Sequence, residues 1–403
     1  MKKYRYEARD SASDKIVKAT IQAESENAAA RVLTAQGFVP LKIDLDGDGA
    51  GFFERLSGRI TVKDKIVFTR QLATLIGAGL PLAQSMRTVL EQTQNKKMQL
   101  IVQDIIADIE GGKALSDSFA KHPEAFDKVF IALVSAGEAS GTLDQALKRV
   151  AAQQEKDAAM MNKIKGALTY PVIVLVVISL VVGFLLLTVV PQVKNLYKDL
   201  GKELPMVTQM MVGAADFATN FWWLMIIMLG IAGYFFSQYL KTDAGIRTKD
   251  SFKLNVPLFK GMFRKLYMAR FTRTGQTLLS TGVAMLDMLR ISADAVNNVL
   301  IAETISRASD KVKGGKALSA SLKGEEYMLI MVPQMIKIGE QSGKIDEMMG
   351  KCAQIYEDEL DEEIKAISTA IEPILMVVLA VVAGGMVVAI LLPIYGLVND
   401  IKL

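Results

Sequence analysis

The stretch that decides the fold is PVIVLVVISLVVGFLLLTVVP, residues 171–191, which contains no charged side chain. A helix needs about 20 apolar residues to cross the hydrocarbon core of a bilayer, whereas a buried helix of a soluble protein is shorter and carries a polar stripe. Residues 221–240 and 373–398 are also free of charged side chains. We therefore expect three transmembrane helices, at residues 171–190, 221–240 and 373–398.

The composition of the whole chain agrees with a membrane protein. Of its 403 residues, 51% are apolar, and the mean hydropathy is positive. The formal net charge of +4 is small for this length, whereas a nucleic-acid-binding domain is usually strongly basic. The only cysteine is Cys352 and the only histidine is His122, so the chain has neither a disulfide framework nor a Cys/His metal set. We expect no cofactor, no metal, no catalytic residue and no nucleic-acid partner.

The distribution of lysine and arginine predicts the orientation in the membrane, because positive residues that flank a membrane helix resist translocation. Residues 148–167 and 241–260 carry five Lys or Arg residues each, whereas residues 191–220 carry three lysines balanced by three acidic residues. The first seven residues, MKKYRYE, are followed by no apolar stretch, so we expect no cleaved signal peptide. These features predict a cytoplasmic N-terminus, a periplasmic loop at 191–220 and, by parity, a C-terminus outside.

The first 45 residues read as a small α/β unit. Apolar residues alternate in residues 4–8 and 17–23, and again in residues 39–43, as in strands with one buried face. Between them we expect a helix with Ser25 as N-cap and Gly37 just past its end. The segment DLDGDG at residues 44–49 imitates a calcium loop, but Arg55 stands where a bidentate glutamate is needed. We therefore interpret residues 46–60 as an acidic linker.

From residue 61 the pattern is helical, beginning with the capping-box spacing of Thr61 and Asp64, and it occurs twice. Phe-Thr-Arg at 68–70 recurs at 271–273, and Gly-Gly-Lys-Ala-Leu-Ser at 111–116 recurs at 314–319. After a one-residue deletion, Gly-Glu-Ala-Ser-Gly at 137–141 corresponds to Gly-Glu-Gln-Ser-Gly at 339–343. The single residues that match are Gly79 with Gly282, Arg87 with Arg290, Pro171 with Pro373, and Pro191 with Pro393. The chain is a duplication.

These observations predict a mainly α membrane protein. Two repeated cytoplasmic helical bundles, three transmembrane helices and a small α/β N-terminal unit make up the expected fold. The expected divisions are an N-terminal unit at 1–45, a linker at 46–60, a first bundle at 61–170, a transmembrane helix at 171–190, a periplasmic loop at 191–220, a transmembrane helix at 221–240, a second bundle at 241–372, a transmembrane helix at 373–398 and a tail at 399–403.

Two recurrent glycine motifs are the candidate sites. We interpret Gly111 and Gly112, like Gly314 and Gly315, as helix ends in the left-handed conformation, because the spacing and the alanine after each lysine do not fit a phosphate-binding loop. The Gly-Glu-x-x-Gly motif leaves two interpretations open. It is either a capped helix corner or a rigid elbow whose glutamate receives a basic residue from a partner or from its own bundle. The residues of this second motif are Gly137, Glu138, Gly141, Gly339, Glu340 and Gly343.

The acidic run at residues 357–363, EDELDEE, is either a solvated helix face or a docking patch. The membrane segments contain glycines at 183, 230, 233, 384 and 385, among others, which predict helix contacts. They contain no ionisable group, which argues against a duplicated transporter, since a solute path normally has one.

The duplicated unit resembles a known family. Gly79, the Gly-Gly-Lys-Ala-Leu and Gly-Glu-x-x-Gly motifs, the proline-bounded membrane helix and the inserted Leu-Pro-Met-Val-Thr at 204–208 are similar to the type II secretion F protein family, which includes the type IV pilus platform proteins. The resemblance covers nearly the whole chain, and residues 4–8 and 37–40 look like the family's N-terminal unit. Asp14 departs from it, where relatives often have glycine.

The resemblance implies a non-catalytic platform in the bacterial inner membrane. It implies partners among a hexameric assembly ATPase, pilins or pseudopilins, other inner-membrane assembly proteins and membrane lipid, and it implies a homo-oligomer. Type IV pilus biogenesis is favoured, and type II protein secretion stays open as an alternative. We also expect ATPase movements to reach the membrane through a continuous helix over residues 142–190, which has no proline before Pro171.

Overall fold

The computed structural model describes residues 2–10, 16–23, 26–35, 38–45, 59–199 and 206–401. The chain divides into two compact units, Met1–Asp64 with Gln92–Val102, and Lys65–Glu91 with Gln103–Leu403. The predicted N-cap Ser25, Gly37 and residues 46–58 of the predicted linker lie outside the described residues, as do Asp14, Leu204 and Pro205.

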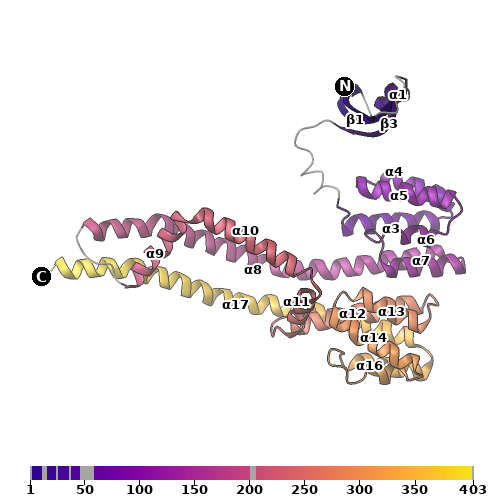
Figure 1. The fold of residues 1–403 in the computed structure, drawn as a ribbon. Coiled ribbons are helices and arrows are strands. Elements are labelled where there is room, and N and C mark those ends of the chain that lie inside the picture. Colours follow the sequence, from indigo (N-terminus) through magenta and orange to yellow (C-terminus); the bar gives the residue numbers. More distant parts are fainter. Residues whose placement is uncertain are drawn as a thin grey trace. The chain divides into compact units, whose positions relative to one another are not determined.

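The N-terminal residues form a three-stranded sheet with one helix (Figure 1). Strands β1 (Lys2–Asp10), β2 (Ile16–Ala23) and β3 (Phe38–Leu45) lie in the order β2-β1-β3, and both pairings are antiparallel. Helix α1 (Glu26–Ala35) connects β2 to β3 and buries Leu33. The register of β1 against β3 shifts between Glu7 and Ala8, which is the two-against-one pairing of a β-bulge.

The first helical bundle is built from α3 (Val62–Gly77), α4 (Leu82–Gln92), α5 (Lys96–Glu110), α6 (Leu115–Ala120) and α7 (Lys128–Ser140). Its first helix begins at the predicted capping box. The Thr61 N–H donates to Asp64 Oδ2 at 2.8 Å, and the Asp64 N–H donates to Thr61 Oγ1 at 3.2 Å. The two side chains therefore satisfy backbone donors that the first turn leaves without partners.

The second bundle repeats this order. It comprises α12 (Lys260–Leu279), α13 (Met285–Ala295), α14 (Val299–Lys313), α15 (Leu318–Leu322) and α16 (Met331–Ser342), preceded by α11 (Asp243–Asn255). The cores differ in chemistry. Phe68, Phe119, Phe126 and Phe130 are buried together in the first bundle, and Phe271, Leu322, Met328 and Val332 are buried at the corresponding positions of the second.

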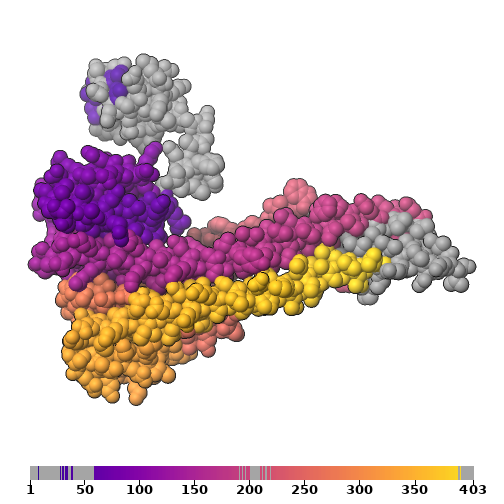
Figure 2. All heavy atoms as spheres, turned by 180° about the vertical axis from the view of Figure 1, so that it is seen from behind, coloured from indigo at the N-terminus to yellow at the C-terminus, as the bar shows by residue number. Residues whose placement is uncertain are grey.

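Each bundle leads into one very long helix, α8 (Leu143–Asp199) after the first and α17 (Ile345–Ile401) after the second. Figures 1 and 2 show these helices running side by side. Between them the chain forms α9 (Met206–Asn220) and α10 (Trp222–Tyr239). Leu143–Val189, Trp222–Tyr239 and Ile345–Val388 are long and apolar enough to cross a membrane, as the three predicted charge-free stretches indicate.

The prolines that bracket two of the apolar stretches do not end the helices there. Pro171 and Pro191 lie inside α8, and Pro373 and Pro393 lie inside α17. A proline removes one backbone donor, but ending a helix in an apolar setting would leave several groups unpaired, so the helix continues. For the same reason the predicted loop at 191–220 is largely helical, with the end of α8 and all of α9 in it.

The predicted helix contacts at the membrane glycines are not made within the described chain. A Cβ atom added at Gly183, Gly230, Gly233, Gly384 or Gly385 would meet no atom of the described residues within 4 Å. The apolar side chains beside them are largely exposed, among them Leu180, Phe184 and Val381. These surfaces match the lipid-facing side of a membrane helix more closely than a packed core.

We predict that Phe119→Ala destabilises the first bundle by about 3–5 kcal/mol. The Phe119 ring is fully buried, and its centroid lies 4.5 Å from that of Phe126 and 4.8 Å from that of Phe130. Thermal unfolding of the full chain in detergent, followed by circular dichroism, measures the effect. The control is Phe252→Ala, since Phe252 is 69% exposed; equal losses in both variants would contradict a packed aromatic core.

Candidate functional site

The Gly-Glu-x-x-Gly motif forms the corner between α7 and α8. Gly141 ends α7 in the left-handed conformation, with φ of 72°, and the Thr142 N–H donates to the Gly137 carbonyl at 2.8 Å. A Cβ atom on Gly137 would lie 2.5 Å from the Ala146 Cβ on α8. Gly141 therefore provides the turn, and Gly137 allows the two helices to approach closely.

The second copy of the motif has the same geometry. Gly343 has φ of 72° at the end of α16, the Lys344 N–H donates to the Gly339 carbonyl at 2.9 Å, and a Cβ on Gly339 would lie 2.7 Å from the Ile345 Cα. Each long helix is therefore joined to its bundle by the same close corner.

The glutamate of this motif binds the other recurrent motif. The Glu138 carboxylate accepts hydrogen bonds from the Leu115 N–H at 2.7 Å, the Ser116 N–H at 3.1 Å and the Ser116 hydroxyl at 2.9 Å. Glu340 likewise accepts from the Ser319 N–H and hydroxyl. The structure thus places the start of a short helix against each carboxylate, where the elbow hypothesis expected a basic side chain.

The electrostatics of Glu138 follow from these bonds. Burial opposes its charged form, but the hydrogen bonds from the Leu115 and Ser116 backbone and from the Ser116 hydroxyl outweigh burial, so the pKa of Glu138 lies below its ordinary value. An ionised carboxylate at the first turn of a helix is also favoured by the partial positive charge of the unpaired N–H groups. Glu138 therefore ties α6 to α7 at the corner.

The remaining recurrent glycines lie in turns that follow helices. Gly79 and Gly282, after α3 and α12, have φ of 86° and 84°, and Gly112 and Gly315 have φ of 82° and 85°. Gly111 and Gly314 precede the latter pair, and their N–H groups bond the carbonyls of Ala107 and Asp310. Each copy of Gly-Gly-Lys-Ala-Leu-Ser therefore ends one helix and starts the short helix that the glutamate caps.

The sequence analysis missed a second repeated contact, between an arginine and a glutamate. Arg273 on α12 donates to both carboxylate oxygens of Glu357 on α17, at 2.7 and 2.8 Å. The corresponding Arg70 on α3 pairs with Glu155 on α8. The Arg273–Glu357 pair is largely buried, with 13% of each side chain exposed, whereas 63% of the Arg70 side chain is exposed. The signal was the recurrent Phe-Thr-Arg motif with a glutamate 85 residues after Arg70 and 84 residues after Arg273, spacings that differ by the one-residue deletion.

The two repeats are joined mainly along α8 and α17. Met160 and Ile164 of α8 are buried against Leu360, Ile364 and Ile367 of α17 and against Met262 and Leu266 of α12. Ion pairs flank this apolar cluster: Lys156 with Glu357 at 3.2 Å and Lys163 with Asp361 at 2.5 Å. The acidic run at 357–363 therefore docks in part against lysines of its own chain.

Asp157 on α8 is a partly buried acid at this joint, with its Oδ1 atom enclosed. Burial raises its pKa to about 6, against the opposing effects of Arg270 and of the hydrogen bond from Gln153, while Asp127 and Glu357 raise it further. Its Oδ1 atom has no hydrogen-bond partner among the described residues. A pKa raised in this way means that the folded state binds the proton more tightly than the unfolded state.

We predict that Glu138→Gln lowers the free energy of unfolding by about 1 kcal/mol at neutral pH, the usual effect of losing a helix cap. Because the pKa of Glu138 is lowered on folding, the difference between wild type and variant should vanish as the pH falls below about 4.3. Thermal unfolding at several pH values measures it. The control is Glu91→Gln, at an exposed glutamate; an identical profile would contradict the capping role.

We predict that Asp157→Asn gains stability relative to the wild type as the pH rises. The contribution of Asp157 to folding is fully present below its ordinary pKa and is lost as the pH rises through its folded-state value of about 6. Melting temperatures of both proteins at about pH 5 and about pH 8 test this sign. The control is Asp144→Asn, which removes an acid paired with Lys148; a constant difference between wild type and Asp157→Asn would contradict the buried titration.

Comparison with known proteins agrees with this architecture. The model of "Type II secretion system (T2SS), protein F" matches residues 68–191 and again 271–393, and the model of the N-terminal domain of type II secretion system protein F matches residues 1–44. The chain is 37% identical to the type IV pilus assembly protein PilC of Thermus thermophilus, over 99% of both chains. It is 37% identical to PilC of Pseudomonas aeruginosa, over 91% of this chain and 98% of that protein.

A more distant relative is the type II secretion system protein F of Xanthomonas campestris, 32% identical over 99% of both chains. The two matches of one family model coincide with the two copies of the bundle, its corner and its long helix. The chain belongs to the type II secretion system protein F family.

Proposed function

We propose that this protein is the inner-membrane platform of a type IV pilus assembly machine. The observation that carries the proposal is the pair of 57-residue helices α8 and α17, each of which continues from a bundle corner into a membrane-capable stretch. At a rise of about 1.5 Å per residue, a helix of this length extends about 85 Å, more than twice the roughly 30 Å of a hydrocarbon core. Each helix therefore links a bundle outside the membrane to the bilayer.

The relatives favour the pilus over the secretion machine. The identity is 37% to two proteins named for type IV pilus assembly and 32% to one named for type II secretion. The protein takes part in such an assembly machinery as a structural component. We propose that it is not an enzyme and that its cytoplasmic surface receives a hexameric assembly ATPase.

We propose three membrane crossings with the N-terminus in the cytoplasm. Lysine and arginine concentrate before the apolar part of α8 and after α10, which supports cytoplasmic bundles at 61–170 and 241–372 and a periplasmic segment at 191–220. The exposed apolar surface of α10, from Trp222 to Tyr239, is available to lipid, pilins or other inner-membrane assembly proteins. A homo-oligomer completes the proposal.

The corners explain how movement would pass through the molecule. Gly137 and Gly339 bring each bundle into close contact with its long helix, and Glu138 and Glu340 tie the short helices to the same corners. A bundle displaced by an ATPase would therefore move its long helix with it. In this proposal the recurrent glycines and glutamates fix the elbow and do not act as a flexible hinge.

Deletion of the gene tests the proposed function. We expect cells without the protein to lack surface pili in electron micrographs and to secrete proteins into the medium at the normal level. Pili that persist while secretion is lost would assign the protein to type II secretion instead, and unchanged pili and secretion would contradict both functions.

We predict that Ala158→Pro abolishes pilus assembly without preventing membrane insertion. Ala158 lies inside α8, before the apolar stretch, and a proline in a helix interior costs about 3 kcal/mol and kinks the helix. The control is Ala158→Gly, which costs about 1 kcal/mol and removes no backbone donor. Membrane fractionation and counts of pili measure both effects; normal piliation of Ala158→Pro would contradict transmission through a continuous α8.

A further inference from the structure

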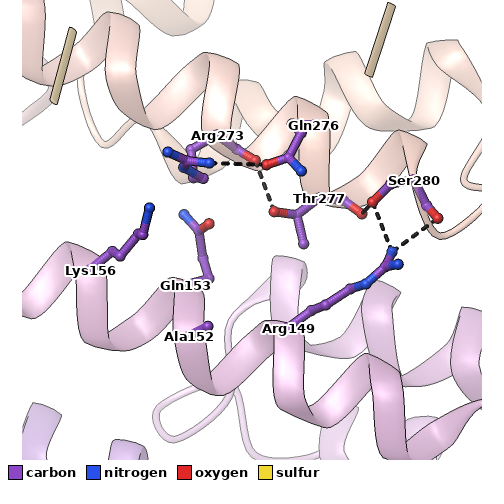
Figure 3. A pocket seen from close by; sticks show the side chains of 8 residues that line it. All are labelled: Arg149, Ala152, Gln153, Lys156, Arg273, Gln276, Thr277 and Ser280. Atoms are coloured by element: carbon purple, nitrogen blue, oxygen red, sulfur yellow. Dashed lines mark hydrogen bonds between the residues drawn. The ribbon is translucent and has the colours of Figure 1, made fainter. Parts of the chain in front are cut away.

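A pocket lies between the first repeat's long helix, α8, and the second repeat's first bundle helix, α12 (Figure 3). Its volume is about 250 Å³, and its lining includes Arg149, Gln153 and Lys156 from α8 and Arg273, Thr277 and Ser280 from α12. No acidic side chain lines it. Neither the family relationship nor the platform role accounts for this arrangement.

The pocket carries an excess of positive charge. Glu357 forms ion pairs with both Arg273 and Lys156, so its single negative charge balances only one of these two positive charges. Arg149 donates through Nη1 to the Ser280 carbonyl oxygen at 2.9 Å and to Ser280 Oγ at 2.8 Å, and no ion pair of Arg149 occurs among the described residues. A cleft lined by charges of one sign concentrates the oppositely charged ion.

A buried acceptor complements these donors. Gln153 is only 7% exposed, and its Oε1 atom has no hydrogen-bond partner among the described residues. Figure 3 shows its side chain directed into the pocket, between Lys156 and Arg149. Leaving a buried acceptor unpaired is unfavourable, and a hydrogen bond from a ligand O–H group would satisfy it. The pocket thus combines cations with one acceptor for a proton-bearing oxygen.

We infer that this pocket binds a protonated phosphate group, either free hydrogen phosphate or the phosphate end of a nucleotide. Pockets for drug-sized ligands are roughly 300–1,000 Å³, so a volume of about 250 Å³ fits a small group. A lipid headgroup is out of reach, since Pro171 lies 15 positions after Lys156 on α8, a distance of about 22 Å along the helix. The bound phosphate bridges the two repeats and stabilises their joint.

Isothermal titration calorimetry on the full chain in detergent, at low ionic strength, tests the inference. We expect saturable binding of inorganic phosphate, and weaker binding of sulfate at the same ionic strength because sulfate has no O–H group for Gln153 Oε1. A parallel titration with AMP separates the sources: tighter binding of phosphate assigns the free anion, and tighter binding of AMP assigns a nucleotide. Absence of saturable binding, or sulfate binding as tight as phosphate, overturns the inference.

A matched pair of variants locates the site. Ala152 lines the pocket, so Ala152→Glu places a carboxylate there without removing any side-chain hydrogen bond, and we expect it to weaken phosphate binding by at least about tenfold. Ala159→Glu adds the same charge at another exposed position of α8 and should change the affinity less than about twofold. Equal effects of the two variants overturn the assignment. Should Ala152→Glu lower the melting temperature, Lys156→Gln provides the second test, with Lys148→Gln as its control.

Discussion

Every backbone N–H and C=O group that enters a bilayer must find its partner within the protein, because hydrocarbon offers none. This chain satisfies the constraint with helices that run through the apolar stretches and through the prolines inside them. The rest of the architecture depends on that continuity. Since α8 and α17 each continue as one helix, the chain passes from each bundle into its long helix through a sharp corner at the first residues, which brings α7 and α16 alongside.

The corner is therefore the place where the two sequence motifs meet. Gly141 and Gly343 supply the left-handed turn, and Gly137 and Gly339 leave room for the next helix. The glutamates of the same motif hold the short helices α6 and α15 by hydrogen bonds. Two motifs about twenty residues apart in each repeat thus form one structural unit, which explains why they occur together in both copies.

Local patterns in the sequence predicted much of this fold. The charge-free stretches predicted the membrane-capable helices, and the spacing of Thr61 and Asp64 predicted the start of α3, because each signal lies within a few residues. The partner of Glu138 could not be predicted, since Ser116 approaches it only after α6 and α7 pack. The joint between the repeats was missed for the same reason: Lys163 and Asp361 are 198 residues apart, and hydrophobic periodicity says nothing about which helices will meet.

The joint is made by unlike faces of the two long helices. Met160 and Ile164 of α8 pack against three apolar residues of α17, namely Leu360, Ile364 and Ile367. The residues of α8 at the corresponding positions are Ala158, Asn162 and Lys165. When a contact joins two different faces of a repeated unit, each unit can bind the next one in the same way. Such head-to-tail contacts, if every copy had both faces, would produce a filament. In the first copy, Asn162 and Lys165 replace two of the apolar residues that form this contact surface in the second copy. Within the chain this contact therefore joins two copies and offers no matching apolar surface to a third, as a terminal cap does in a repeat protein.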